Sequence, residues 1–147
     1  MRLTTFTDYS LRVLIFLAAA PDGRTTIADV ARAFRISENH LVKVVHLLGK
    51  EGILLNTRGH GGGLRLARPA HEINIGQVVR LTEGRDMPAE CFDKETNTCL
   101  LAGGCRLQGV LKQAVEKFYE VLEQYTVADL RARSRSASWV PRLHEAR

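Results

Sequence analysis

Apolar positions recur at helical spacing in three stretches of the first fifty residues. In residues 8–20 the periodic positions are Leu11, Leu14, Ile15 and Ala18. The same spacing continues in residues 27–34 (Ile27, Val30, Ala31 and Phe34) and in residues 38–50 (Leu41, Val44, Val45 and Leu48). Steps of three and four residues put each set on one helix face, so the pattern predicts three amphipathic helices around a common core.

The ends of these predicted helices carry capping residues. The expected N-caps, in chain order, are Thr7, then Thr25 or Thr26, then Ser37. Only Arg35 and Ile36 separate the second helix from the third, and Gly52 is expected to end the third in the left-handed conformation. Two short helices joined by a tight turn predict a helix-turn-helix, and the second of them is the candidate recognition helix.

Two short apolar strands follow and flank a glycine-rich tip. Residues 53–55 and 64–66 read as strands around residues 57–63, Thr-Arg-Gly-His-Gly-Gly-Gly. Glycines there allow positive φ and a close approach of the backbone to phosphate, so the hairpin predicts a wing. A nucleotide-binding loop is the alternative, but the GxxxxGK[ST] pattern is absent and the loop joins two strands.

Basic and polar side chains cluster on this predicted winged module. The candidate DNA-binding residues are Ser37, Asn39, His40, Lys43, Arg58, Gly61, Gly62 and Arg65. Asn39 has the chemistry to read adenine, and Lys43 to contact guanine or a phosphate. Arg58 suits a narrow minor groove, where the negative potential attracts arginine. The alternative for each residue is an ordinary solvated helix face.

The second half of the chain is predicted to hold a short helix at residues 74–81 and a long one at residues 106–125. The long segment has a heptad seam made of Leu107, Leu111, Ala114, Phe118, Val121 and Tyr125. Such a seam is typical of a dimer interface, with packing against the winged module as the alternative. A dimer pairs two recognition helices and matches a palindromic operator in double-stranded DNA.

Charge is distributed unevenly along the 147 residues. Residues 1–80 hold 11 Lys and Arg against 6 Asp and Glu, residues 81–130 hold 5 against 9, and residues 131–147 hold 5 against 1. The basic first half is a candidate polyanion-binding surface, and the basic tail at 131–147 is expected to be flexible. No apolar run reaches the roughly 18–20 residues of a membrane span. No nucleophile–base constellation points to an enzyme.

All three cysteines, Cys91, Cys99 and Cys105, fall within fifteen residues. An odd number of cysteines argues against a closed disulfide framework, and thiols without an export signal indicate a reducing cytoplasm. Three thiolates leave a four-ligand centre one ligand short, and the nearby carboxylates are Asp93 and Glu95. The alternatives are one disulfide with a spare thiol, three unrelated thiols, or structural zinc of the Cys₃His or Cys₃-carboxylate type. Because zinc sites usually contain a tight C-x₂₋₄-C knuckle, the wider spacing favours an iron–sulphur cluster.

Three blocks of sequence carry a resemblance to a known family. They are residues 1–14 (MRLTTFTDYSLRVL), residues 58–64 (RGHGGGL), and Cys-Arg-Leu from residue 105 with Tyr-Thr-Val-Ala-Asp-Leu at 125–130. Together they resemble the nitric-oxide-sensing (NsrR-like) repressors among the Rrf-type winged helix-turn-helix regulators of bacteria. The related iron–sulphur-biogenesis regulators carry a histidine ligand three residues after the last cysteine, where this chain has Gln108.

The resemblance implies a cytoplasmic homodimer with one iron–sulphur cluster per subunit, 4Fe–4S favoured over 2Fe–2S. The implied ligands are Cys91, Cys99, Cys105 and, from the partner subunit, Asp8. Nitric oxide is the implied signal: nitrosylation of the cluster releases DNA, and nitric-oxide-detoxification genes are derepressed. An iron–sulphur-biogenesis or redox regulator of the same family and a zinc-stabilised winged-helix repressor are the alternatives.

The predicted fold is mainly α, a winged helix-turn-helix with a long C-terminal dimerisation helix. We expect a DNA-binding module at residues 1–82 and a cysteine-rich cluster-binding loop at 83–105. The dimerisation helix and a short cap follow at 106–130, and the flexible basic tail at 131–147. The expected class of protein is a transcriptional repressor, neither an enzyme nor a membrane protein.

Overall fold

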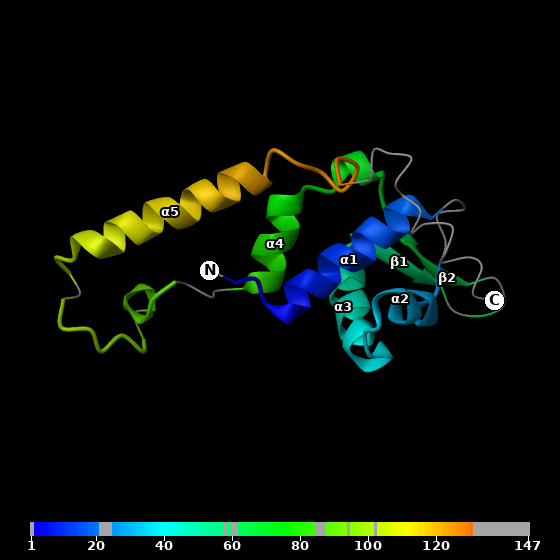
Figure 1. Cartoon of the computed structure of the whole chain (residues 1–147), viewed down its shortest axis with the longest axis horizontal. Helices are drawn as coiled ribbons and strands as arrows, with labels where there is room; N and C mark the ends of the chain where they lie inside the picture. Colours follow the sequence, from blue (N-terminus) through cyan, green and yellow to red (C-terminus); the bar gives the residue numbers. More distant parts are fainter. Residues whose placement is uncertain are drawn as a thin grey trace.

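The computed structural model describes residues 2–20, 25–57, 59, 62–84, 88–93, 95–101 and 103–130. In chain order these contain α1 (Thr5–Ala19), α2 (Ile27–Phe34), α3 (Glu38–Lys50), β1 (Leu54–Thr57), β2 (Gly63–Leu66), η1 (Ala70–Glu72), α4 (Ile75–Glu83), η2 (Glu90–Phe92) and α5 (Arg106–Leu122). The fold is therefore mainly α with a two-stranded hairpin, as the hydrophobic pattern predicts (Figure 1). No helix in these described ranges is long and apolar enough to cross a membrane.

Helix α1 begins earlier than its sequence suggests. Its N-cap is Thr4, whose hydroxyl accepts the Thr7 N–H at 3.2 Å, so the prediction of Thr7 as N-cap is wrong. Thr7 is fully buried instead, and its hydroxyl donates to Thr82 Oγ1 on α4 at 2.8 Å. A threonine in a first turn suits a cap as well as a buried helix contact, and only the neighbouring helix decides between them.

Helix α2 is fixed at its start by a capping box. The Thr26 hydroxyl accepts the Asp29 N–H at 3.1 Å, and the Asp29 carboxylate accepts the Thr26 N–H at 3.0 Å. Partial burial raises the pKa of Asp29, but the hydrogen bonds from Thr26 and Thr25 and the charge of Arg32 together outweigh it and lower that pKa below 3.8. The half of the box made by the Asp29 carboxylate is therefore fully formed at neutral pH and weakens as the pH falls through this lowered pKa.

A residue in the left-handed conformation follows each helix of the helix-turn-helix. Arg35 ends α2 at φ 54° and ψ 44°, and Ile36 N–H donates back to Ala31 O at 3.0 Å. Gly52 follows α3 at φ 64°, as predicted, and Ile53 N–H donates to Leu48 O at 2.9 Å. Ser37 occupies the N-cap position of α3, but its side chain makes no capping hydrogen bond.

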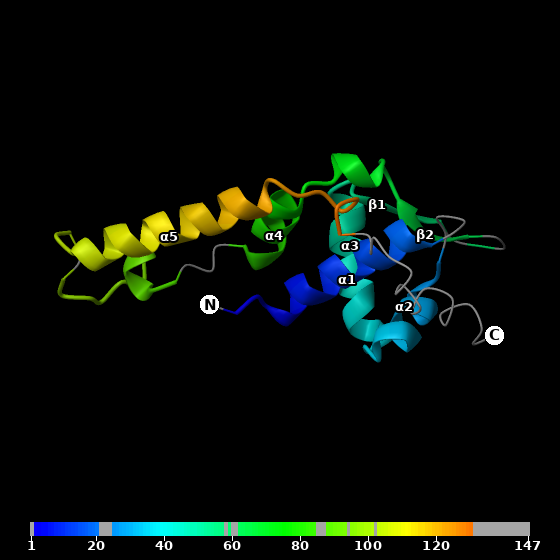
Figure 2. The ribbon, with the colours of Figure 1, turned by 45° about the horizontal axis from the view of Figure 1, so that its top comes forward.

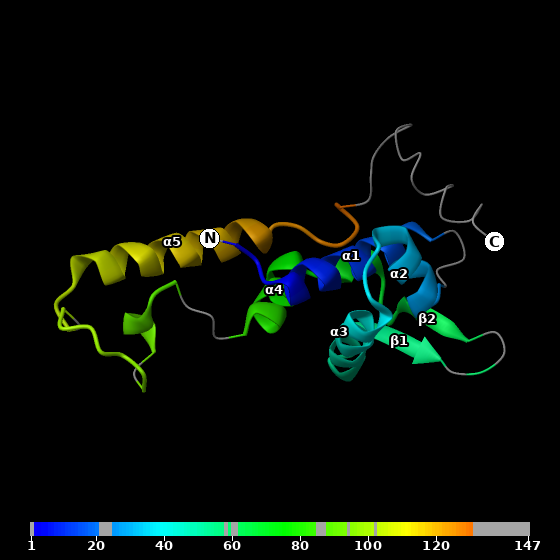
Figure 3. The ribbon, with the colours of Figure 1, turned by 60° about the horizontal axis from the view of Figure 1, so that its bottom comes forward.

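The wing is an antiparallel pair in register Leu54↔Leu66, Leu55↔Arg65, Asn56↔Leu64 and Thr57↔Gly63. Thr25 bridges Leu64 on the outer side of β2, which ties the start of α2 to the wing. Figure 3 shows the two strands side by side at the end of the molecule opposite the first turns of α5.

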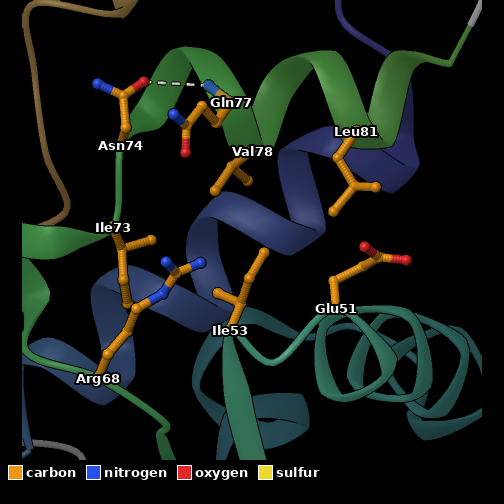
Figure 4. Close-up of a pocket in the computed structure, with 8 residues that line it drawn as sticks. All are labelled: Glu51, Ile53, Arg68, Ile73, Asn74, Gln77, Val78 and Leu81. Carbon is orange, nitrogen blue, oxygen red and sulfur yellow. Dashed lines mark hydrogen bonds between the residues drawn. The ribbon is translucent and has the colours of Figure 1, made fainter.

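The core lies where α1, α3, α4 and the wing meet. Its fully buried members include Val13, Leu14, Leu41, Leu48, Leu54, Leu64 and Val79. Figure 4 shows the edge of this junction, where Ile53, Val78 and Leu81 point into a hollow of about 200 Å³ and Asn74 accepts the Gln77 N–H at 3.1 Å to cap α4. Helix α4 packs against α1, on the side of α1 away from the wing (Figure 1).

Among the described residues, helix α5 contacts the winged module near its C-terminal end. Arg80 on α4 bonds Glu123 Oε1 at 2.9 Å and lies 3.9 Å over the Tyr119 ring, and Asn74 Nδ2 donates to Glu123 O at 2.6 Å. The helix ends at Leu122, short of the predicted Tyr125, because the chain turns back and pairs Val127 N–H with Ile73 O at 2.9 Å. A short turn capped by Asp129 on Thr126 follows, as predicted.

The N-terminal half of α5 and the described cysteine-bearing residues extend away from the module, as the three views agree (Figures 1–3). The predicted basic tail at residues 131–147 lies outside the described residues.

Candidate DNA-binding face and cysteine segment

The outward face of α3 gathers four of the predicted DNA-binding residues. Ser37, Asn39, His40 and Lys43 are all exposed at the first turns of α3. Asn39 and Lys43 are four residues apart and therefore neighbours on one face. Arg65 is exposed on β2 and Gly62 is half-buried at the wing, whereas Arg58 and Gly61 lie outside the described residues.

Helix α1 contacts both helices of the helix-turn-helix through ring contacts. The Tyr9 and His40 rings lie 6.1 Å apart, which links α1 to the start of α3. The Arg12 guanidinium lies 5.7 Å over the Phe34 ring at the end of α2. A movement of α1 along its axis would therefore alter its contacts with both α2 and α3.

Asp8, the predicted fourth ligand, is engaged within its own helix. Its carboxylate pairs with Arg12 at 2.8 Å, and Arg12 Nε donates to Asp8 Oδ1 at 3.0 Å. The Asp8 side chain is 44% exposed, so the pair is solvated and open to exchange with another partner.

The first turn of α1 is also tied to the end of α4, where the cysteine segment begins. Glu83 Oε1 accepts from Thr4 N at 2.8 Å and from Thr4 Oγ1 at 3.0 Å. With the Thr7–Thr82 bond, these contacts form a partly buried polar clasp of Thr4, Thr7, Thr82 and Glu83 between α1 and α4.

The three cysteines are free thiols and all are half-buried. Cys91 lies in η2 and Cys105 is the N-cap residue of α5. Between Cys91 and Cys99, Asp93 organises a compact turn: it accepts from Glu95 N and Thr96 Oγ1, each at 2.9 Å. Gln108 on α5 donates to Cys91 O at 2.6 Å and so holds the two ends of the segment together.

Within the described ranges, no three His, Cys, Asp or Glu side chains lie close enough to hold a metal ion. The donor set nonetheless fits an iron–sulphur cluster in kind, since three free thiols in one short segment would supply three of its four protein ligands. The carboxylate of Asp93, an alternative ligand from sequence, is used by the turn it organises.

The predicted heptad seam on α5 is divided between two surfaces. Phe118, together with Tyr119 and Leu122, packs against the core. Leu107 and Val121 of the seam are 61% and 53% exposed, and Val110, an apolar residue beside the seam, is 60% exposed. The sequence thus indicates one seam where the structure has an inward stripe and an outward one, because α5 meets the module along only part of its length.

Sequence reasoning missed two exposed apolar side chains beside the candidate DNA-binding residues of α3. Val42 on α3 is 50% exposed and Leu55 on β1 is 41% exposed. Both line a hollow of about 450 Å³ between α3 and β1. The signal was present, because Val42 falls outside the buried positions 41, 44, 45 and 48 of α3 and is still apolar.

A helix-turn-helix, a hairpin wing and an exposed, polar first turn of α3 define a winged-helix transcription regulator. The chain belongs to the Rrf2 family, described as iron-dependent transcriptional regulators, whose family model matches residues 3–133. It is thus a DNA-binding transcriptional repressor by family, and the prediction that it is no enzyme is confirmed by that membership.

Sequence relatives named HTH-type transcriptional regulator NsrR cover most of the chain. The protein of Shouchella clausii is 52% identical over 131 residues, which is 88% of both chains. That of Bacillus subtilis is 47% identical over 131 residues, or 88% of this chain and 90% of the relative. The predicted resemblance to this group is confirmed.

Solved structures share the fold. Staphylococcus aureus CymR superposes with a TM-score of 0.73 at 23% identity, covering 90% of this chain and all of CymR. T. potens IscR gives 0.70 at 24% identity, covering 88% and 85%. At these identities the structural similarity shows a shared fold and nothing more.

Proposed function

We propose that this chain is a homodimeric, cytoplasmic repressor whose affinity for a palindromic operator responds to nitric oxide through an iron–sulphur cluster. The observation that carries the proposal is the set of three free thiols, held between the α4 clasp and the first turn of α5, in a chain 52% identical to an NsrR regulator. The proposed ligands are Cys91, Cys99, Cys105 and Asp8 of the partner subunit.

The DNA-binding role falls to the exposed face of α3 and the wing. Asn39 and Lys43 would enter the major groove with Ser37 and His40 beside them, and Arg65 would contact phosphate. The proposed DNA-binding set also includes Arg58, Gly61 and Gly62 of the wing. The assignment of Arg58 and Gly61 rests on the sequence alone. Exposure of the first-turn side chains and of Arg65 supports this assignment.

The cofactor proposed is one cluster per subunit, of the 4Fe–4S type. When bound, it supplies iron that reacts with nitric oxide. The cysteines would supply thiolates, and residues 88–105 would close so that the three sulphur atoms converge. Glycine at 103, with φ 98°, and Gly104, with open space around its Cα, give the segment before Cys105 the freedom to do so.

Asp8 is the residue that would connect this segment to the DNA-binding face. To serve as a ligand it must leave Arg12, whose guanidinium also lies over Phe34. The same helix carries Tyr9 against His40. Engagement of Asp8 by the partner subunit would thus act on α2 and α3 through α1, and the Thr4–Glu83 clasp would resist that displacement.

The visible spectrum and the operator affinity of the anaerobically purified protein test this proposal. We expect a brown protein whose DNA affinity falls at least tenfold on addition of nitric oxide, and we expect Cys99→Ser to lose both colour and response. Thr98→Ser, beside it in the same segment, should keep both. A colourless wild type containing zinc, or equal affinity with and without nitric oxide, contradicts the proposal.

A further inference from the structure

Val42 is an apolar side chain on the face of α3 that is otherwise polar. It lies three residues after Asn39 and four before His46, so the three side chains are neighbours on one helix face. The core side of α3 is already filled by Leu41, Val44, Val45 and Leu48, all buried. Half of Val42 remains in water, where an apolar side chain contributes nothing to folding.

The surroundings of Val42 favour a polyanionic partner. Val42 shares its hollow with Leu55, His46, Lys50 and Asn56. Lys43 and Lys50 make no ion pair within the described part of the chain, and Arg65 is exposed on the strand that pairs with Leu55. A small apolar area bordered by unpaired basic side chains suits the DNA major groove better than a protein surface.

The major groove offers one apolar group, the C5-methyl of thymine, and small apolar side chains on recognition helices contact it. We propose that Val42 is a specificity-determining residue that reads thymine through this methyl, with Leu55 enclosing the contact from the wing side. This inference rests on the proposed placement of α3 in the major groove. It assigns a preference for thymine to Val42, an exposed residue that cannot recognise a base by hydrogen bonding.

Deoxyuridine provides the test, because it differs from thymidine only in lacking the C5-methyl. A DNA fragment is first selected from a random library by the full-length wild-type chain, then synthesised with either thymidine or deoxyuridine throughout. Burial of one methyl is worth about fourfold in affinity. We expect the wild type to bind the deoxyuridine fragment about three- to tenfold more weakly.

Val42→Ala should bind the thymidine fragment more weakly and should lose most of the preference for thymidine over deoxyuridine, since the alanine side chain is too short to reach the thymine methyl. Lys43→Ala, the adjacent exposed position, should weaken binding to both fragments and keep the wild-type ratio. Because Val42 is half-exposed, the variant is expected to fold, which circular dichroism checks. A wild-type ratio near one, or an undiminished ratio in Val42→Ala, overturns the inference; failure to select any DNA overturns the placement of α3 instead.

Discussion

Arg35 is the non-glycine residue with positive φ among the described residues, at φ 54° in the turn between α2 and α3. A left-handed conformation costs an L-residue about 1–2 kcal/mol because Cβ approaches the following carbonyl. The turn holds this conformation through the Ile36 N–H to Ala31 O bond and the burial of Ile36. Glycine is the residue that such a position ordinarily carries.

Replacing Arg35 by glycine should therefore stabilise the protein. After allowing for the greater freedom of glycine in the unfolded chain, we expect the free energy of unfolding to rise by about 0.5–1 kcal/mol. Urea denaturation followed by circular dichroism measures it. Arg35→Ala keeps the strain and is the control; a glycine variant less stable than the alanine variant would show that the backbone is unstrained.

The same turn shows what sequence can supply at the scale of single residues. Gly52 was predicted as left-handed because glycine commonly adopts positive φ, whereas arginine does not, so the conformation of Arg35 could not be predicted from its residue type. Thr4 and Thr7 are chemically identical candidates for the N-cap of α1, and their roles are separated by Thr82 and Glu83, almost eighty positions away. Residue type predicts local conformation well, but not the long-range contact that chooses between equivalent residues.

At the scale of elements, the crossing of α4 and α5 depends on Gly76. A Cβ on this buried glycine would collide with Glu123 Cγ and would lie 2.9 Å from Glu123 N. Backbone contact of this kind fixes how closely the end of α5 approaches α4, and with it the positions of Asn74 and Arg80 against Glu123.

Gly76→Ala should force these segments apart and lower the free energy of unfolding by about 1–3 kcal/mol, as overpacking does. The matched control is Gly49→Ala in α3, where the nearest atom is Leu54 O at 3.9 Å. That change should instead raise stability by about 0.5–1 kcal/mol through helix propensity. Thermal melts of the two variants, monitored in parallel, decide; equal shifts of the same sign would refute the role assigned to Gly76.

The elements themselves were largely predictable, because α2 and α3 and the start of α4 follow their hydrophobic periods and caps closely. The end of the last helix was not. The heptad pattern continues to Tyr125, but tertiary pairing of residues 125–128 with residues 70–75 ends the helix at Leu122. Periodicity also does not show which part of an apolar stripe packs within its own subunit. The division of the seam on α5 into a packed part and an exposed part was therefore not predicted.

At the scale of the whole molecule, the winged module and the cysteine segment lie at opposite ends of α5 (Figure 1). The cysteine arrangement was the part of the candidate site that sequence predicted least. Its spacing indicates the donor set, but convergence of the sulphur atoms depends on what closes the segment. The stripe of Leu107, Val110 and Val121 gives α5 an apolar surface that leads directly to Cys105.

If that stripe is the dimer interface, charge placed on it should separate the subunits. We expect the double variant Leu107→Glu with Val110→Glu to change the mass measured by light scattering from a dimer to the 16.4 kDa monomer, because like charges would be buried against each other. Lys112→Glu, exposed on the opposite side of α5, should remain dimeric. Since both leucine and valine positions are exposed, the monomer should still unfold cooperatively. A double variant that stays dimeric would move the interface elsewhere, and a partner-supplied Asp8 ligand would then lose its geometric basis.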